Sequence, residues 1–356
     1  MIPKPTQINA AMKTFIPIAL ISASFTIPMV HAQTGTTTPV GYETLQLNAG
    51  LNYVSVRLHE SSTTAGELVS SSGTTLTVQD GVADALMSGT TYILEITSGT
   101  DDVLGLITEI SSWDPTNDEI VTDADLTLFT GFTGSENFNI RPVSTIASVF
   151  GPNNEIGLQA SVSFATADQI LFFNGAGFDK YFYNPGGGFG QTAGWKDESG
   201  SDINPEDIEI SYSESFIILS QQGDDITISG ELKVSPTQLP VFNGINYLGT
   251  VYPVGDPLQT ENPDTIASLF GSGNVSGFNE SVSIATADQI LIPNGAGFDK
   301  YFYNPGGGFG QTEGWKDEDG NDIDPSSIIL TPGILVSSPD SNKNISLILP
   351  DAISNL

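Results

Sequence analysis

Two stretches of this chain repeat each other at a fixed spacing, and this repetition constrains the fold more than any other feature of the sequence. The stretch 145–208 matches 265–328 at a constant offset of 120 residues without a gap, and 174–192 is identical to 294–312. A repeat of this length forms one structural unit, so the two stretches are expected to fold alike. The absence of gaps also fixes the strand lengths, because a slip of one residue would turn every side chain of a strand to the opposite face.

Weaker similarity extends on both sides of the matched stretch. Downstream, 217–228 and 334–347 share a layout of strand, turn and strand. Upstream, a fainter echo links 50–53 (GLNY) to 244–247 (GINY). The repeated unit is therefore expected to be longer than the stretch that matches without a gap.

The local sequence signals favour strands throughout. Runs rich in β-branched residues, such as 74–78, 91–96 and 103–110, are bounded by Gly, Ser and Asp. The 38 Gly and 21 Pro residues fit many tight turns. No amphipathic helical pattern is sustained. The sequence therefore predicts an all-β fold of tandem small β-sandwich or barrel-like modules with short helical turns.

Two short helices are expected at equivalent places in the two copies. They span 145–150 and 265–270, each with a polar residue before it and a Gly after it. Ser144 and Asp264 are the predicted N-caps, because a side-chain oxygen there can accept a hydrogen bond from a free backbone N–H of the first turn.

The first 32 residues have the features of a secretory signal. Lys4 and Lys13 give a positive start, 15–30 is an apolar run too short to span a bilayer as a helix, and 30–32 (VHA) offers a cleavage site. We therefore expect cleavage near Ala32 and export to the periplasm, the outer surface or the extracellular space. No later stretch is long and apolar enough for a membrane-spanning helix, so no transmembrane segment is predicted in the mature chain.

These features predict an order of domains. The expected parts are a signal peptide at 1–32, a flexible lead at 33–39, an N-terminal β domain at 40–128, a first repeat module at 129–232 and a second at 233–356.

Charge narrows the range of partners. The chain has 42 acidic and 10 basic residues, and loss of Lys4 and Lys13 with the leader leaves eight basic residues and a net charge of −34. Nucleic acid and anionic membranes both require a basic surface, so they are excluded as partners. Solubility in salty surroundings explains the acidity, because salt screens self-repulsion. Binding of a divalent cation is a more specific alternative explanation of the acidic composition.

The mature sequence lacks residues that many enzyme mechanisms require. It has no Cys, and His59 is its single histidine, so thiol nucleophiles, disulfides and His-rich zinc sites are excluded. Carboxylate pairs remain, because glycoside hydrolysis needs only two acids about 5–9.5 Å apart. The candidates are Asp168, Asp179 and Asp197 with their equivalents Asp288, Asp299 and Asp317. Since 42 acidic residues produce such pairs by chance, an acid-pair hydrolase is the least favoured interpretation.

Several short motifs resemble an uncharacterised family of exported β-rich bacterial proteins, many of them from Verrucomicrobia. The similar segments are 41–44 (GYET), 53–56 (YVSV), 92–99 (YILEITSG), 140–142 (IRP), 145–151 (TIASVFG), 167–170 (ADQI) and the following Tyr/Trp segment. The resemblance implies export and a β-rich fold, and it implies no catalytic residue. This chain differs in carrying two copies of the segment from 145 to 195, where one is expected.

A Tyr/Trp segment is the most distinctive part of each repeat. Alternation in 178–183 (FDKYFY) puts Phe178, Lys180 and Phe182 on one face and the tyrosines on the other. If the tyrosines and the following Trp are exposed, they could stack on sugar rings. The ligand-binding candidates are Tyr181, Tyr183, Trp195, Tyr301, Tyr303 and Trp315. The alternative, that these rings fill a small core, is favoured, because a module of this size needs large apolar residues.

One loop resembles the start of a calcium-binding loop. Asp317, Asp319 and Asn321 place oxygens at the first, third and fifth positions, but position six is Asp322 rather than Gly, and position twelve is Ile328 rather than Glu. A plain Asp/Gly turn is the favoured interpretation, with Ca²⁺ as a weak alternative and no other cofactor expected.

Three functions remain for the chain. The first hypothesis is a non-catalytic secreted or cell-surface protein with a structural or interaction role, whose repeats present two equivalent faces to other envelope proteins or to polysaccharide. The second is a carbohydrate-binding module that uses the Tyr/Trp segments. The third is the acid-pair hydrolase.

Overall fold

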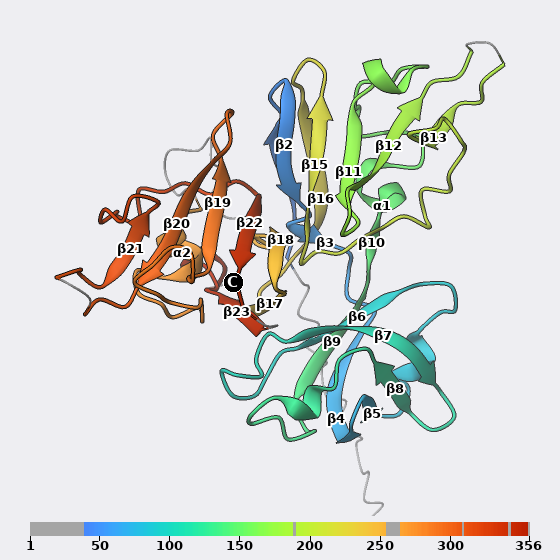
Figure 1. Ribbon diagram of the computed structural model, residues 1–356. Coiled ribbons are helices and arrows are strands. Elements are labelled where there is room, and N and C mark those ends of the chain that lie inside the picture. Colours follow the sequence, from blue (N-terminus) through green and yellow to red (C-terminus); the bar gives the residue numbers. More distant parts are fainter. Residues whose placement is uncertain (1–38, 188–189, 254–263, 308–309, 341–342, 355–356) are drawn as a thin grey trace, which may run out of the picture. The chain divides into compact units, whose positions relative to one another are not determined.

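The computed structural model describes residues 39–187, 190–253, 264–307, 310–340 and 343–354 (Figure 1). The predicted signal peptide lies outside these residues, as does most of the predicted flexible lead. The described chain consists mainly of strands, with short helices and 3-10 turns between them. The prediction of an all-β fold with short helical turns is therefore confirmed.

Six strands close into a small barrel in the order β4-β5-β8-β7-β6-β9. They are β4 (Thr64–Ser72), β5 (Thr75–Val78), β6 (Tyr92–Ile96), β7 (Ile107–Asp114), β8 (Glu119–Thr122) and β9 (Asn137–Pro142), with 3-10 turns η1 (Ala83–Ala85) and η2 (Leu126–Leu128). Its interior is packed with aliphatic and aromatic side chains, among them Leu76, Leu94 and Phe138. The barrel is thus a solid core of its own.

The first repeat combines a five-stranded sheet, β13-β12-β11-β15-β2, with a three-stranded sheet, β1-β16-β3. Its elements are β1 (Val40–Gln46), β2 (Gly50–Ser55), β3 (Leu58–His59), β10 (Ser144–Thr145), α1 (Ile146–Phe150), η3 (Phe164–Thr166), β11 (Gln169–Phe173), β12 (Phe178–Asn184), β13 (Gly194–Asp197), β14 (Glu209–Ile210), β15 (Ser215–Ser220) and β16 (Asp225–Leu232). One hydrophobic cluster collects Val54, Phe150, Trp195, Ile218 and Ile226 from these elements.

The second repeat has the same strand order in its five-stranded sheet, β21-β20-β19-β22-β18, beside the pair β17-β23. Its elements are β17 (Thr237–Val241), β18 (Gly244–Gly249), α2 (Ile266–Phe270), β19 (Gln289–Pro293), β20 (Phe298–Asn304), β21 (Gly314–Asp317), β22 (Gly333–Ser338), β23 (Lys343–Leu347) and α3 (Asp351–Ser354). The registers also agree, since Tyr183 faces Trp195 and Tyr303 faces Trp315. The expectation that the two copies fold alike is met in strand order and in register.

The predicted N-terminal domain at 40–128 requires a correction. Strands β1, β2 and β3 pair with the end of the first repeat rather than with the barrel. Thr44 lies opposite Thr227, Tyr53 opposite Ile217, and β3 pairs with β16. The barrel, in turn, continues to the end of β9, past the predicted boundary at 128. It is an insertion between β3 and β10 of the first repeat.

This insertion explains why the upstream similarity lies at a different offset. Asn52 in β2 is 194 residues from its equivalent Asn246 in β18, whereas Trp195 is 120 residues from Trp315. The difference of 74 residues is the extra length that the first repeat carries between these points. Both asparagines hold the same turn. Asn52 Nδ2 donates to the Asn48 carbonyl at 2.8 Å, and Asn246 Nδ2 donates to the Phe242 carbonyl at 2.8 Å.

The two short helices occur where the sequence placed them, but their N-caps lie one residue later. Thr145 and Thr265 cap α1 and α2, each in a reciprocal capping box with the Ser three residues on, Ser148 or Ser268. The predicted cap Ser144 pairs instead with β14 as part of β10. The other predicted cap, Asp264, forms an ion pair with Arg57.

Candidate functional site

The Tyr/Trp segments lie in the cores of the repeats. Trp195 and Trp315 are each only 2% exposed. Their indole N–H groups donate to equivalent carbonyls, Trp195 to Gly151 at 2.9 Å and Trp315 to Gly271 at 3.0 Å. The hypothesis that these tryptophans stack on a ligand at the surface therefore needs a correction, because they are buried and their polar atoms are already satisfied.

The tyrosines of these segments face the same cores. Tyr181 and Tyr183 are half-buried against the cluster that contains Trp195, and the Tyr183 and Trp195 rings meet edge to face at 5.6 Å. In the second repeat Tyr301 is half-buried and Tyr303 is 4% exposed, with its hydroxyl donating to Glu313 at 2.9 Å. The tyrosine face thus points inward, contrary to the exposed arrangement required for a stacking surface.

The loop that resembles a calcium site is a closed turn. Asp317 Oδ1 accepts hydrogen bonds from the backbone N–H groups of Asp319 at 3.0 Å and Asn321 at 2.8 Å, and Asp317 Oδ2 accepts from Asn321 Nδ2 at 2.9 Å. These bonds lower the pKa of the Asp317 carboxyl. Over the described residues, no group of three or more His, Asp or Glu side chains is arranged to hold a metal ion.

The six carboxylates considered as acid pairs serve structural purposes in the fold. Asp168 accepts from the backbone N–H groups of Gln159 at 2.8 Å and Gln221 at 2.7 Å. Its equivalent, Asp288, is buried in an ion pair with Lys343. Asp179 and Asp299 accept from Asn174 and Asn294, and Asp197 and Asp317 hold equivalent turns. None of the six lines the groove described next.

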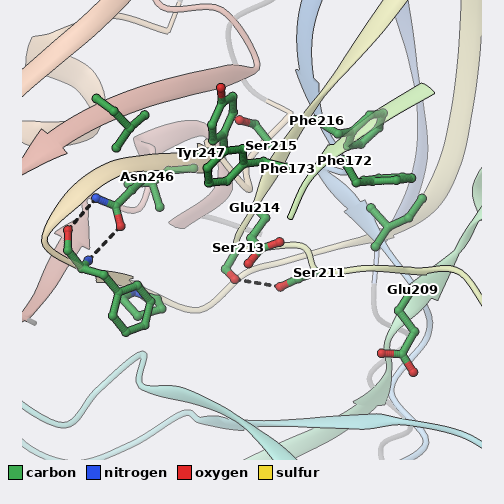
Figure 2. Close-up of a pocket in the computed structure, with 15 residues that line it drawn as sticks. Phe172, Phe173, Glu209, Ser211, Ser213, Glu214, Ser215, Phe216, Asn246 and Tyr247 are labelled. Carbon is green, nitrogen blue, oxygen red and sulfur yellow. Dashed lines mark hydrogen bonds between the residues drawn. The ribbon is translucent and has the colours of Figure 1, made fainter. Parts of the chain in front are cut away.

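An open groove of about 440 Å³ lies where the two repeats meet (Figure 2). We call it groove A. Its lining comes from β14, the segment 211–214 and the ends of β11 and β15 in the first repeat, and from β17 and β18 in the second. Its lining side chains are Phe172, Phe173, Glu209, Ile210, Ser211, Ser213, Glu214, Ser215, Phe216, Pro240, Phe242, Ile245, Asn246, Tyr247 and Leu248.

Aromatic and aliphatic side chains form the exposed part of groove A. Phe173 is 40% exposed, Phe242 54% and Ile245 46%, which is unusual for large apolar residues. The Phe173 ring stacks on Tyr247 with centroids 4.8 Å apart and planes inclined by 28°. Phe173 and Tyr247 thus form a stacked aromatic pair to which both repeats contribute.

Hydroxyl and carboxylate groups border this surface. Ser211 and Ser213 share a hydrogen bond of 2.8 Å, and Glu214 and Glu209 lie beside them (Figure 2). Desolvation and the nearby Glu109 carboxylate raise the pKa of the Glu214 carboxyl. Groove A therefore offers flat apolar faces together with several oxygen atoms that can accept or donate hydrogen bonds.

Close packing between the repeats fixes the groove. The contacts are reciprocal, because Tyr247 meets Phe178 edge to face at 5.9 Å and its equivalent Tyr53 meets Phe298 at 6.1 Å. Two glycines of the second repeat permit this approach. A Cβ on Gly249 would lie 2.8 Å from the Tyr212 carbonyl oxygen, and one on Gly333 would lie 2.8 Å from the Val54 nitrogen. The repeats pack as a pseudo-symmetric pair.

A buried cluster of ionisable side chains joins the barrel to the first repeat. Arg141 on β9 contacts Glu95 on β6 at 3.3 Å and Glu231 on β16 at 3.5 Å, and Lys233 contacts Glu95 at 3.2 Å. His59 completes the cluster, with its Nε2 donating to the Val251 carbonyl at 3.0 Å and its ring against Tyr212 at 4.8 Å. His59 Nδ1 has no hydrogen-bond partner among the described residues.

Electrostatics in this cluster keep His59 neutral and Glu95 charged. Burial, followed by the charge of Arg141, lowers the pKa of His59 to about 3. Burial raises the pKa of Glu95, but the charges of Lys233 and Arg141 outweigh it and hold that pKa at about 2. The cluster is internally compensated, so we assign it a structural role.

The sequence reasoning missed the residues of groove A. Phe173, Phe242 and Glu214 belong to no motif, and the only signal was the echo between 244–247 and 50–53, which includes Tyr247. That echo locates a hairpin turn but does not show that its aromatic residue lies beside the other repeat.

Comparisons of the chain with protein-family models, with curated proteins and with solved structures gave no match. Among the described residues, no helix is both long enough and apolar enough to cross a membrane.

Proposed function

We propose that this chain is a non-catalytic, exported interaction protein that binds a neutral polysaccharide in groove A. The observation that supports the proposal is that one groove holds exposed Phe173 stacked on half-buried Tyr247, together with exposed Phe242, serine hydroxyls and Glu214. Sugar rings bind through apolar faces stacked on aromatic rings and through hydroxyls paired with polar side chains. The groove supplies both kinds of group within one site.

Charge selects the kind of polysaccharide. A chain with a formal net charge of −32 repels polyanions, and Glu214 and Glu209 place negative charge at the groove itself. Neutral sugars avoid this repulsion, and their hydroxyls can donate to the carboxylates. A secreted or cell-surface location, inferred from the leader at 1–32, would bring the protein to envelope or environmental polysaccharides.

The direct test is binding of soluble neutral polysaccharides, such as a β-glucan, a xylan and a mannan, measured by calorimetry. The double variant Phe173→Ala/Phe242→Ala should weaken binding by at least tenfold, the equivalent of about 1.4 kcal/mol, because aromatic contacts dominate such sites. Leu128→Ala is the matched control, since Leu128 is 80% exposed on the barrel and should leave binding unchanged.

Three outcomes contradict the proposal. Absence of binding to every polysaccharide, with the protein recovered in envelope fractions, would favour a purely structural role. Equal binding by the double variant would place the site elsewhere. Release of reducing ends during the binding assay would show catalysis and contradict the non-catalytic assignment.

A further inference from the structure

A second groove of about 320 Å³ lies on the other side of the contact between the repeats. We call it groove B. It is lined by residues of β1 and by Asn48, Leu51, Tyr53, Pro293, Thr331 and Pro332. Here β1 and β2 come from the first repeat, and the ends of β19 and β22 come from the second. The contributions of the two repeats are thus exchanged relative to groove A.

Groove B is the pseudo-symmetric counterpart of groove A. Leu51, Asn52 and Tyr53 occupy the positions of Ile245, Asn246 and Tyr247, 194 residues away. The other side agrees as well. Pro293 is equivalent to Phe173 at the offset of 120. Phe173 is the last residue of β11, which pairs with β12, and Pro293 is the last residue of β19, which pairs with β20.

The same backbone supports both grooves, because the turn asparagines bond alike. Asn52 Oδ1 accepts from the Asn48 N–H at 2.8 Å, and Asn246 Oδ1 accepts from the Phe242 N–H at 2.8 Å. Asn48 and Phe242 are therefore held in equivalent positions at the mouths of their grooves. What differs between the grooves is the set of side chains on this shared scaffold.

These substitutions make groove B uncharged and less aromatic. Asn48 stands where groove A has Phe242, and Pro293 replaces Phe173. The registers of β15 and β22 correspond at an offset of 118, so Pro332 replaces Glu214 and Thr331 replaces Ser213. Leu51 remains 58% exposed, and Tyr53 is half-buried. Groove B keeps one aromatic ring and an exposed aliphatic side chain, with amide and hydroxyl groups in place of carboxylates.

We infer that groove B is a second, weaker subsite for the same neutral polysaccharide, so that one long polymer engages the chain at two places. This inference rests on the proposed function of groove A. The occupant is a neutral sugar segment because the lining has no charged side chain, the chain repels polyanions, and groove B shares with groove A the turn asparagine, the neighbouring tyrosine and the backbone that holds them. Two linked subsites raise the affinity for a long polymer without any new contact.

The experiment compares a neutral tetrasaccharide with the long polymer of the same sugar. The wild-type chain should bind two tetrasaccharides, one of them weakly. The variant Asn48→Ala/Leu51→Ala should bind one, with the affinity of groove A unchanged, and should bind the long polymer at least about tenfold more weakly through lost avidity. Leu128→Ala should match the wild type in both assays.

A gain-of-binding variant tests groove B in a way that unfolding of the protein cannot imitate. Asn48→Phe restores the aromatic side chain of groove A at the equivalent position, so it should tighten the weaker tetrasaccharide site several-fold. A single tetrasaccharide site in the wild type, together with polymer affinity unaffected by Asn48→Ala/Leu51→Ala, would overturn the inference and leave groove A intact. Failure of the wild type to bind any neutral polymer would overturn both proposals.

Discussion

Ser215 and Gly333 occupy equivalent positions in β15 and β22, as the pairing of these strands with β11 and β19 shows, and they face each other across the contact between the repeats. Only 2.6 Å separates the Ser215 Cβ from the position that a Cβ on residue 333 would take. Ser55 and Gly249 form a second pair of the same kind, at 3.0 Å. Residues that are equivalent by repetition thus meet at the pseudo-symmetry axis, where one side must be glycine because two side chains do not fit.

The first prediction tests this packing. Gly333→Ala should lower the free energy of unfolding by about 1–3 kcal/mol, because the new methyl group would overlap Ser215 and the Val54 backbone. The matched control is Gly297→Ala, where a Cβ meets nothing within 4 Å and the change should stay within about 0.5 kcal/mol. Urea denaturation measures both, and equal stabilities would contradict the close approach of the repeats.

The second prediction concerns the two tryptophans. Trp195→Phe and Trp315→Phe should each destabilise the protein by about 2 kcal/mol, because each loses buried area and the indole N–H hydrogen bond to the Gly151 or Gly271 carbonyl. Each variant should also lose the same blue-shifted component of fluorescence emission. Unequal emission from the two residues would show that the repeats differ in their cores.

The third prediction is a pH dependence that arises from His59. Its folded pKa of about 3 lies below the unfolded value of about 6.5, so the unfolded chain binds more protons between these values. Stability should therefore fall as the pH drops below about 6.5, by at most about 1.4 kcal/mol per pH unit. Glu95, with a folded pKa of about 2 against 4.5, adds to the loss below pH 4.5.

The variant His59→Gln isolates the histidine. It cannot titrate, and its amide can still donate to the Val251 carbonyl, while Arg141, Lys233, Glu95, Glu231 and Tyr212 remain around it. Between pH 6.5 and 4.5 the stability of this variant should depend less on pH than that of the wild type. Parallel curves from urea denaturation would show that His59 is protonated in the folded state.

The fourth prediction concerns calcium. Asp317 already accepts three protein hydrogen bonds, so removal of calcium with EDTA should leave the melting temperature unchanged. Millimolar calcium should act no differently from sodium at equal ionic strength, because it screens the acidic surface. Saturable stabilisation at micromolar calcium that disappears in Asp317→Ala would instead reveal a specific site.

The sequence predicted the strand-rich class and the equivalence of the repeats, because these depend on local composition and on a gapless offset. It could not reveal the barrel as an insertion. Thr44 and Thr227 are neighbours in the fold but 183 residues apart, and no local pattern encodes such a pairing. It also left open which face of 178–183 enters the core, because alternation separates two faces without showing which of them meets Trp195.

Groove A was beyond prediction for a related reason. Phe173 and Tyr247 belong to different repeats, and their contact depends on how the repeats pack. Each residue alone looks like an ordinary strand-end aromatic. The two rings form a surface only because the packing of the repeats brings them together.

The inserted barrel also has a consequence for the order in which the chain is made. Strand β2 pairs with β15, which follows it by more than 150 residues. The equivalent of β15 in the second repeat is β22, which is synthesised later still. The barrel can fold during this interval, since its strands pair only with one another. Because domains generally fold as units, the N-terminal first, β15 is available before its competitor. We therefore expect synthesis from the N-terminus to favour pairing of β2 with β15 over exchange with the similar strand of the second repeat.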